Sequence, residues 1–122
     1  MKKSNLDLVI LESPYAGEIE RNIKYARLCM HDCFNRNEAP FASHLLYTQD
    51  YVLDDDIPEE RELGIDAGLL WGAQAKKTVV YEDFEYSNGM KYGIENAKRA
   101  GRTIEIRKLP EEVFEEHFRD KS

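Results

Sequence analysis

Apolar positions along the chain fall into four short runs separated by longer amphipathic segments. Residues 6–11, 39–43, 78–81 and 103–106 form the short runs, whose apolar and β-branched content is typical of strands. Between them, three segments repeat apolar residues at three- and four-residue spacings, which predicts helices over 18–35, 58–74 and 87–101. A fourth helical segment follows at 110–120.

Turn and capping residues set the limits of these elements. Residues 13–17, Ser-Pro-Tyr-Ala-Gly, predict a turn after the first strand. Pro58 suits the first turn of a helix, with Asp56 as its candidate cap, and Ser87 is a candidate cap for the next one. Gly101 is expected to end that helix.

The periodicity also predicts which helix positions face inward. In the second long helix we expect the apolar face to consist of Leu63, Ala67, Leu70 and Trp71, with Trp71 buried. Cys29 and Cys33 lie four residues apart on one face of the first helix. This spacing favours two small buried side chains over a disulfide framework or a redox Cys-x-x-Cys pair. No second spaced pair supports a metal site, although His44 could in principle supplement the cysteines.

The alternation of strand and helix specifies the fold class. Four strand–helix units in so short a chain predict a single α/β domain over 1–122, a three-layer sandwich with a four-stranded, mostly parallel sheet. The sequence contains no internal repeat or domain boundary.

Composition and charge narrow the functional classes. The net charge is −7, which argues against a protein that coats a nucleic acid polymer, because such binding needs Lys and Arg to neutralise phosphates. A mean hydropathy of −0.64 argues against a membrane span, and the polar residues 1–5 do not begin a signal peptide. We therefore expect a cytoplasmic protein.

Three segments at the carboxyl ends of predicted strands are candidates for a binding site. Ligands of open parallel sheets bind at these ends. The segments 13–17, 43–47 and 83–90 are therefore expected to converge on one pocket, and Ser13, Pro14 and Tyr15 are candidate ligand-binding residues. The first segment has one glycine where a dinucleotide fingerprint needs three, so an NAD site is excluded and no cofactor is expected.

The segment 87–90 has the composition of an anion-binding helix N-terminus. A Ser hydroxyl, a glycine that permits close approach and free backbone N–H groups can hold a phosphate or carboxylate. The candidate residues are Ser87, Asn88, Gly89 and Met90. An ordinary serine cap explains Ser87 equally well.

Two further side chains are candidates for ligand contacts. Arg61 can bind a phosphate with two hydrogen bonds, or it can pair with neighbouring acids at the surface. His44 follows the second strand and can hydrogen-bond a ligand, or it can brace its own loop.

Several of these motifs, in order, resemble one family. Together they are similar to the small phage and bacterial relatives of nucleoside 2-deoxyribosyltransferases, often labelled DUF4406-like or DUF7768-like. The resemblance runs from about residue 8 to residue 107, and its motifs are residues 13–17, Asn22, Ala26, 39–47, 58–61, 64–65 and 87–90.

The resemblance implies a flavodoxin-like sandwich that binds nucleosides or nucleotides and, in active members, breaks or exchanges the N-glycosidic bond with a carboxylate nucleophile. In those enzymes the glutamate falls at the position of Gly93, whereas the nearest acid here is Glu95. Two residues turn a helix by about 200°, so Glu95 points elsewhere. A second acid common before the third strand is replaced by Lys76 and Lys77.

Two principal hypotheses follow. In the first, the protein binds a nucleotide without cleaving it. One example is a phage protein that sequesters a cyclic or ADP-ribose-derived immune signal in the host cytoplasm. Lys76 or Lys77 then adds positive charge near the phosphates, or else is a solvated residue at the strand edge. In the second, it is a nucleotide N-glycosidase or deoxyribosyltransferase that uses another acid. The candidate acids are Glu12, Glu82, Asp83 and Glu85.

A structural or protein-interaction role is a third alternative, with the last helix docking a partner. The resemblance also implies a homo-oligomer. Tyr51 and residues 54–56 are the first places to look for its interface, and the loop 47–56 is a candidate lid.

Overall fold

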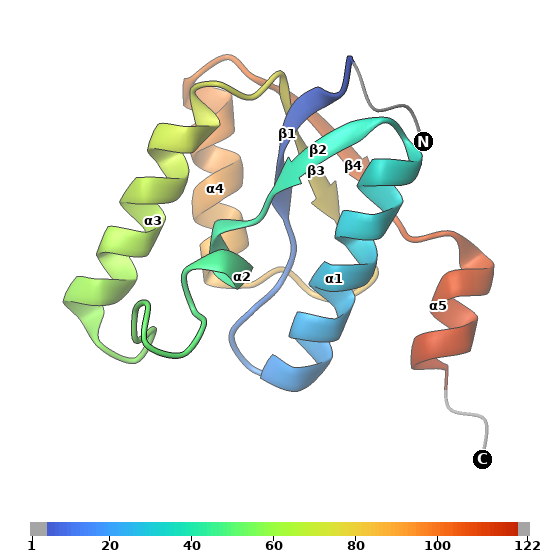
Figure 1. Ribbon diagram of the computed structural model, residues 1–122, viewed down its shortest axis with the longest axis horizontal. Coiled ribbons are helices and arrows are strands. Elements are labelled where there is room, and N and C mark those ends of the chain that lie inside the picture. Colours follow the sequence, from blue (N-terminus) through green and yellow to red (C-terminus); the bar gives the residue numbers. More distant parts are fainter. Residues whose placement is uncertain (1–4, 120–122) are drawn as a thin grey trace.

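The computed structural model describes residues 5–119, and its centre is a four-stranded sheet (Figure 1). The strands are β1 (Asp7–Glu12), β2 (Glu38–Phe41), β3 (Lys77–Tyr81) and β4 (Thr103–Arg107), in the order β2-β1-β3-β4. Every pairing is parallel, with Ile10 opposite Phe41 on one side and Thr78 on the other. The predicted fold class is confirmed, and the sheet is parallel throughout.

Helices cover both faces of this sheet. They are α1 (Ile19–Asn35), α2 (Ser43–Leu46), α3 (Pro58–Gly72), α4 (Asn88–Arg99) and α5 (Glu111–Phe118). Figure 1 shows α1 and α5 on one side of the sheet and α3 and α4 on the other, with the short α2 between β2 and α3. Among residues 5–119, no helix has both the length and the apolar character that crossing a bilayer requires.

The capping residues bear out part of the sequence prediction. Ser87 caps α4, where its hydroxyl accepts the Met90 amide at 3.3 Å, and Gly101 follows the helix with φ +68°. The expectation that Asp56 caps α3 is wrong, because Ile57 occupies the N-cap position and its side chain makes no capping hydrogen bond. The second predicted strand ends at Phe41, and residues 43–46 form α2 instead. The last helix ends at Phe118; its predicted end, Asp120, lies outside the described residues.

The main hydrophobic core lies between the sheet and the α1–α5 layer. Val9, Leu11 and Val79 from the strands pack with Tyr25 of α1, and Phe84, Phe114 and Phe118 pack against this cluster. Cys29 and Cys33 are free and fully buried within it, as predicted. Burial raises the pKa of both thiols, that of Cys33 to about 12, so both behave as small apolar side chains.

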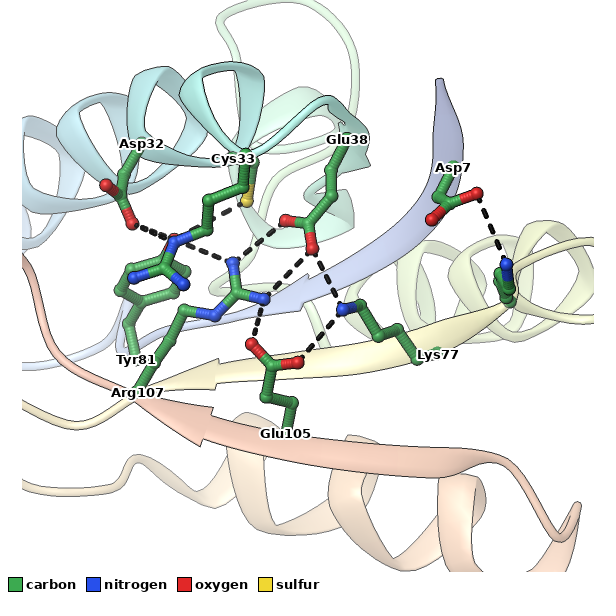
Figure 2. Close-up of polar contacts among 10 residues, drawn as sticks. Asp7, Asp32, Cys33, Glu38, Lys77, Tyr81, Glu105 and Arg107 are labelled. Atoms are coloured by element: carbon green, nitrogen blue, oxygen red, sulfur yellow. Dashed lines mark hydrogen bonds and ion pairs between the residues drawn. The ribbon is translucent and has the colours of Figure 1, made fainter. Parts of the chain in front are cut away.

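A largely buried ionic network crosses the same face from the carboxyl end of β4 to the amino ends of β2 and β3 (Figure 2). Arg107 donates two hydrogen bonds to the carboxylate of Glu38, at 2.8 and 3.0 Å, and a third to Glu105. Lys77 lies 3.0 Å from Glu38 and 2.9 Å from Glu105. Burial alone would raise the pKa of Glu38, but these donors hold it below its usual value. The network therefore keeps both glutamates ionised on this face.

The α3 helix does not present the predicted inward face. Leu63, Leu70 and Trp71 are 60%, 77% and 56% exposed, so the expectation that they pack inward and that Trp71 is buried is wrong. The side turned to the rest of the molecule carries Gly64 and Gly68 instead. Because glycine adds nothing to an apolar pattern, the periodicity of the leucines indicated the wrong side of this helix.

Candidate functional site

A cavity of about 590 Å³ separates α3 and α4 on the second face of the sheet. Its mouth lies at the carboxyl ends of the strands, where the segment after β1, α2 and the N-terminus of α4 meet, and it continues inward past Ile10 to Arg102. Among the residues that line it are Glu12, Ser13, Tyr15, His44, Tyr47, Tyr86, Ser87, Asn88 and Gly93. The volume is within the range typical of small-molecule sites.

Glycines line one wall of the cavity. Gly64, Gly68 and Gly72 follow at four-residue intervals on one face of α3, and all three border the cavity. A Cβ atom at Gly68 would lie 2.7 Å from the Ser43 hydroxyl oxygen, and one at Gly72 would lie 3.3 Å from Arg102. The absence of side chains therefore lets α2 and Arg102 approach the backbone of α3.

On the opposite wall, Gly93 makes room for the side chain of Glu12. A Cβ atom at position 93 would lie 2.1 Å from Glu12 Oε2, well inside van der Waals contact. Glu12, the last residue of β1, thus places its carboxyl group against the backbone of α4, in the space that a side chain at position 93 would fill. Among residues 5–119, Glu12 has no hydrogen-bond or ion-pair partner for that group.

Burial determines the protonation state of Glu12. Desolvation raises the pKa of the carboxyl group to about 8, and the positive charge of Arg102 opposes the shift only in part. Arg102 itself donates a hydrogen bond to the buried Thr78 hydroxyl at 3.2 Å. At neutral pH the cavity therefore contains an un-ionised carboxyl group and a guanidinium ion.

Ser13 and His44 form a second polar feature of the cavity. The Ser13 hydroxyl and His44 Nε2 are hydrogen-bonded at 2.7 Å, which joins the loop after β1 to α2. Burial lowers the pKa of His44 to about 4, so the imidazole is neutral at physiological pH. A neutral imidazole offers one donor and one acceptor. One of these bonds Ser13, which fits the bracing role for His44.

The N-terminus of α4 opens into the cavity mouth. The Ser87 hydroxyl is occupied by the cap to Met90, so the cap interpretation of Ser87 is correct. The backbone amides of Asn88 and Gly89 donate to no residue in the described part of the chain. These two N–H groups, at the positive end of a helix of 12 residues, are suited to an anion.

The other predicted ligand residues differ in their access to the cavity. Tyr15 lines it, whereas Pro14 is buried and is not part of the lining. Arg61 lies at the mouth with its Nε 3.8 Å from Asp55, and its side chain is 44% exposed. Arg61 therefore combines the two alternatives, since it pairs with an acid and still borders the cavity.

Of the four candidate acids, only Glu12 lines the cavity. Glu82 accepts the Tyr86 hydroxyl at 2.8 Å, and Glu85 pairs with Arg21 at the surface. Asp83 accepts hydrogen bonds from the Tyr25 hydroxyl and from the Leu109 amide, so it braces the core. Asp83 and Glu85 thus pair with residues of α1, whereas the partner of Glu82 is a tyrosine that itself borders the cavity.

The two lysines at the start of β3, Lys76 and Lys77, also lie away from the site. Lys76 pairs with Asp7 at 3.5 Å, and Lys77 belongs to the ionic network at the amino end of the sheet. Neither lines the cavity, so the expectation that they add charge near a bound phosphate is wrong. The cation inside the cavity is Arg102, which the sequence analysis did not select. The feature of the sequence that could have identified Arg102 is its position between Gly101, which follows α4, and the first residue of β4.

No three His, Cys, Asp or Glu side chains of residues 5–119 gather in a way that could hold a metal ion.

Comparison with known proteins identifies a family but no characterised relative. Residues 7–107 match the model of a family described as a domain of unknown function, DUF7768. No curated protein and no solved structure matches the chain.

Proposed function

Because the chain belongs to the DUF7768 family, whose description names no activity, its function must be argued from the cavity, and we propose that it binds a nucleotide or a nucleotide-derived small molecule. One observation carries the proposal: within residues 5–119, a cavity of about 590 Å³ has helix amides without a partner at its mouth and the unpartnered Glu12 carboxyl group inside. The amides suit a phosphate, and the carboxyl group suits a neutral polar group. A nucleotide carries both.

Aromatic side chains at the mouth support the same ligand class. Tyr15, Tyr47, Tyr86 and Tyr92 all border the cavity, and their rings offer flat surfaces on which a base or sugar can stack. The resemblance to nucleoside 2-deoxyribosyltransferase relatives points in the same direction. Sequestration of a cyclic or ADP-ribose-derived signal is one form that such binding can take.

A second candidate function, cleavage of the N-glycosidic bond, is favoured by the location of Glu12. A buried carboxyl group that keeps its proton at neutral pH is suited to general acid catalysis. Glu12 would give its proton to a ring nitrogen of the leaving base while the bond from sugar carbon to base nitrogen breaks. Water would then add to the sugar carbon and return one proton to the Glu12 carboxylate. The cavity wall has no acid at Gly93 to act as the nucleophile that the resemblance implies.

One experiment tests both candidates. The purified protein is incubated with nucleoside monophosphates, cyclic dinucleotides and ADP-ribose, then separated from free ligand and analysed by chromatography before and after heat denaturation. We expect intact ligand that is released only by heating. Free base accumulating with time would establish cleavage instead, and a protein that retains none of these compounds would refute the proposal.

A further inference from the structure

The carboxyl group of Glu12 lines the cavity, is only partly exposed, and has no hydrogen-bond or ion-pair partner among residues 5–119, so it is available to a ligand. We propose that Glu12 recognises the base of the bound nucleotide by hydrogen-bonding an edge of that base on which a donor lies beside an acceptor. This inference rests on the proposed function and adds to it the residue that selects the ligand.

The geometry of α4 sets the separation between the phosphate and the base. Gly93, which contacts the Glu12 carboxyl group, follows the N-cap Ser87 by six residues. At 1.5 Å per residue, this is about 9 Å along the helix. That separation is close to the distance from the 5′-phosphate to the base of an extended nucleotide. A phosphate on the free amides of Asn88 and Gly89 therefore brings the base to Glu12.

The protonation state of Glu12 determines which edge it can bind. An un-ionised carboxyl group offers one O–H donor and one carbonyl acceptor side by side. This pair complements a ring nitrogen beside an amino group, as in adenine and cytosine, and also an N–H beside a carbonyl. An ionised carboxylate offers only acceptors, so one of its oxygens would face the acceptor atom of the base and repel it. The raised pKa of Glu12, about 8, keeps the donor present at neutral pH.

The groups that face Glu12 are consistent with this state. Arg102 lies before β4 and favours the ionised form, but burial outweighs its effect. His44 of α2 is neutral and hydrogen-bonded to Ser13, and the Glu12 carboxyl group lies against Gly93 of α4. The remaining charged groups border the mouth and carry both signs: Asp55, Asp56, Glu60 and Arg61.

Two substitutions at Glu12 distinguish recognition of the base from a general effect of the substitution on binding in the cavity. Glu12→Gln keeps one donor and one acceptor in the same shape, whereas Glu12→Ala removes both. Glu95→Ala is the matched control, because Glu95 lies on α4 two residues beyond Gly93, is 57% exposed and does not border the cavity. Circular dichroism and thermal unfolding establish that each variant is folded.

Affinities are measured by titration calorimetry at pH 7 for AMP, CMP, GMP, UMP and ADP-ribose, with ribose 5-phosphate as the probe that lacks a base. For the compound that binds the wild type most tightly, we expect Glu12→Ala to lose about tenfold or more, the value of two hydrogen bonds. Glu12→Gln stays within about threefold, and Glu95→Ala is unchanged. Ribose 5-phosphate binds the wild type and Glu12→Ala equally.

The pH dependence provides an independent readout. In the wild type, affinity for the selected nucleotide should fall as the pH rises above about 8, where Glu12 loses its proton, and in Glu12→Gln it should stay level. The inference is overturned if Glu12→Ala binds the nucleotide like the wild type, or if ribose 5-phosphate loses as much affinity as the nucleotide does. If the wild type binds neither these six compounds nor a cyclic dinucleotide, the proposed function itself fails.

Discussion

The two faces of the sheet are built from alternate residues of the same strands, and they differ in almost every other respect. On β1, Val9 and Leu11 point into the packed core beneath α1, whereas Ile10 and Glu12 border the cavity beneath α3 and α4. Carboxylates on the core side are held ionised by Arg107 and Lys77, whereas Glu12 on the cavity side has no partner in the described part of the chain and keeps its proton. One face thus provides stability, and the other leaves polar groups available to a ligand.

The largest effect is expected from breaking the ionic network on the packed face. Arg107→Ala would leave the buried carboxylate of Glu38 with only Lys77 as a cationic partner, and should lower the free energy of unfolding by about 3 kcal/mol. Chemical denaturation at pH 7 measures this loss. Lys76→Ala, which removes the exposed pair with Asp7, should cost less than about 0.5 kcal/mol. Equal costs for the two variants would show that burial of the network adds nothing.

The cavity face should show its character in the pH dependence of stability. Glu12 has an ordinary pKa of 4.5 and a native pKa of about 8, so between these values the native state binds more protons than the unfolded state. Stability therefore falls as the pH rises through this window. Glu12→Gln removes the titration, so its stability advantage over the wild type should grow steadily as the pH rises from 4 to 9.

The comparison is made by denaturation across that pH range, with Glu95→Gln as an exposed control. A difference between Glu12→Gln and the wild type that does not change with pH would mean that the native carboxyl group titrates normally.

A smaller effect is expected from Tyr25→Phe on the packed face. The Tyr25 hydroxyl is fully buried, donates to the Asp83 carboxylate and accepts the Asp83 amide at 2.9 Å. Its removal should lower the free energy of unfolding by about 1–2 kcal/mol, because Asp83 loses a donor. Ligand affinity should stay unchanged, since neither residue borders the cavity. A loss of affinity would show that the two faces are coupled.

The smallest change in stability is expected at Gly93. Gly93→Ala gains about 0.5–1 kcal/mol of helix propensity but pushes the Glu12 carboxyl group away from α4, so the net change should stay within about 1 kcal/mol. Nucleotide affinity should fall about tenfold or more, because the displaced carboxyl group no longer meets the base. Gly89→Ala is the stability control, since its Cβ would meet only Ser87 Oγ at 4.0 Å. Wild-type affinity in Gly93→Ala would contradict this arrangement.

The sequence predicted the packed face better than the cavity face, and the reason is physical. Apolar periodicity identifies positions that gain by leaving water, so the four strands, the inward cysteines and the Ser87 cap were accessible from it. Three glycines on the inner side of α3 contribute no hydrophobic signal, and the exposed Leu63, Leu70 and Trp71 dominated the pattern. The fold could be derived from what side chains bury, whereas the cavity depends on where side chains are missing.

The candidate site was predicted in outline and not in its chemistry. Segments at the carboxyl ends of β1 and β3 and residues after β2 do border one cavity, as parallel-sheet topology requires. Glu12 could be distinguished from Glu82, Asp83 and Glu85 only by the contacts that each makes in three dimensions. Ligand binding, self-association and cellular location stay predictions.

The glycine wall of α3 has a thermodynamic consequence. Most binding pockets are lined by side chains whose rotamers must be fixed when a ligand arrives, at roughly 0.5–1.5 kcal/mol for each flexible group. Gly64, Gly68 and Gly72 add no side chain to this wall, and Leu53, Ser43 and Arg102 pack against their backbone. These three positions of α3 therefore contribute no rotamers for a ligand to fix, so on this helix the entropy cost of binding falls on neighbours such as Ile65 and Leu69.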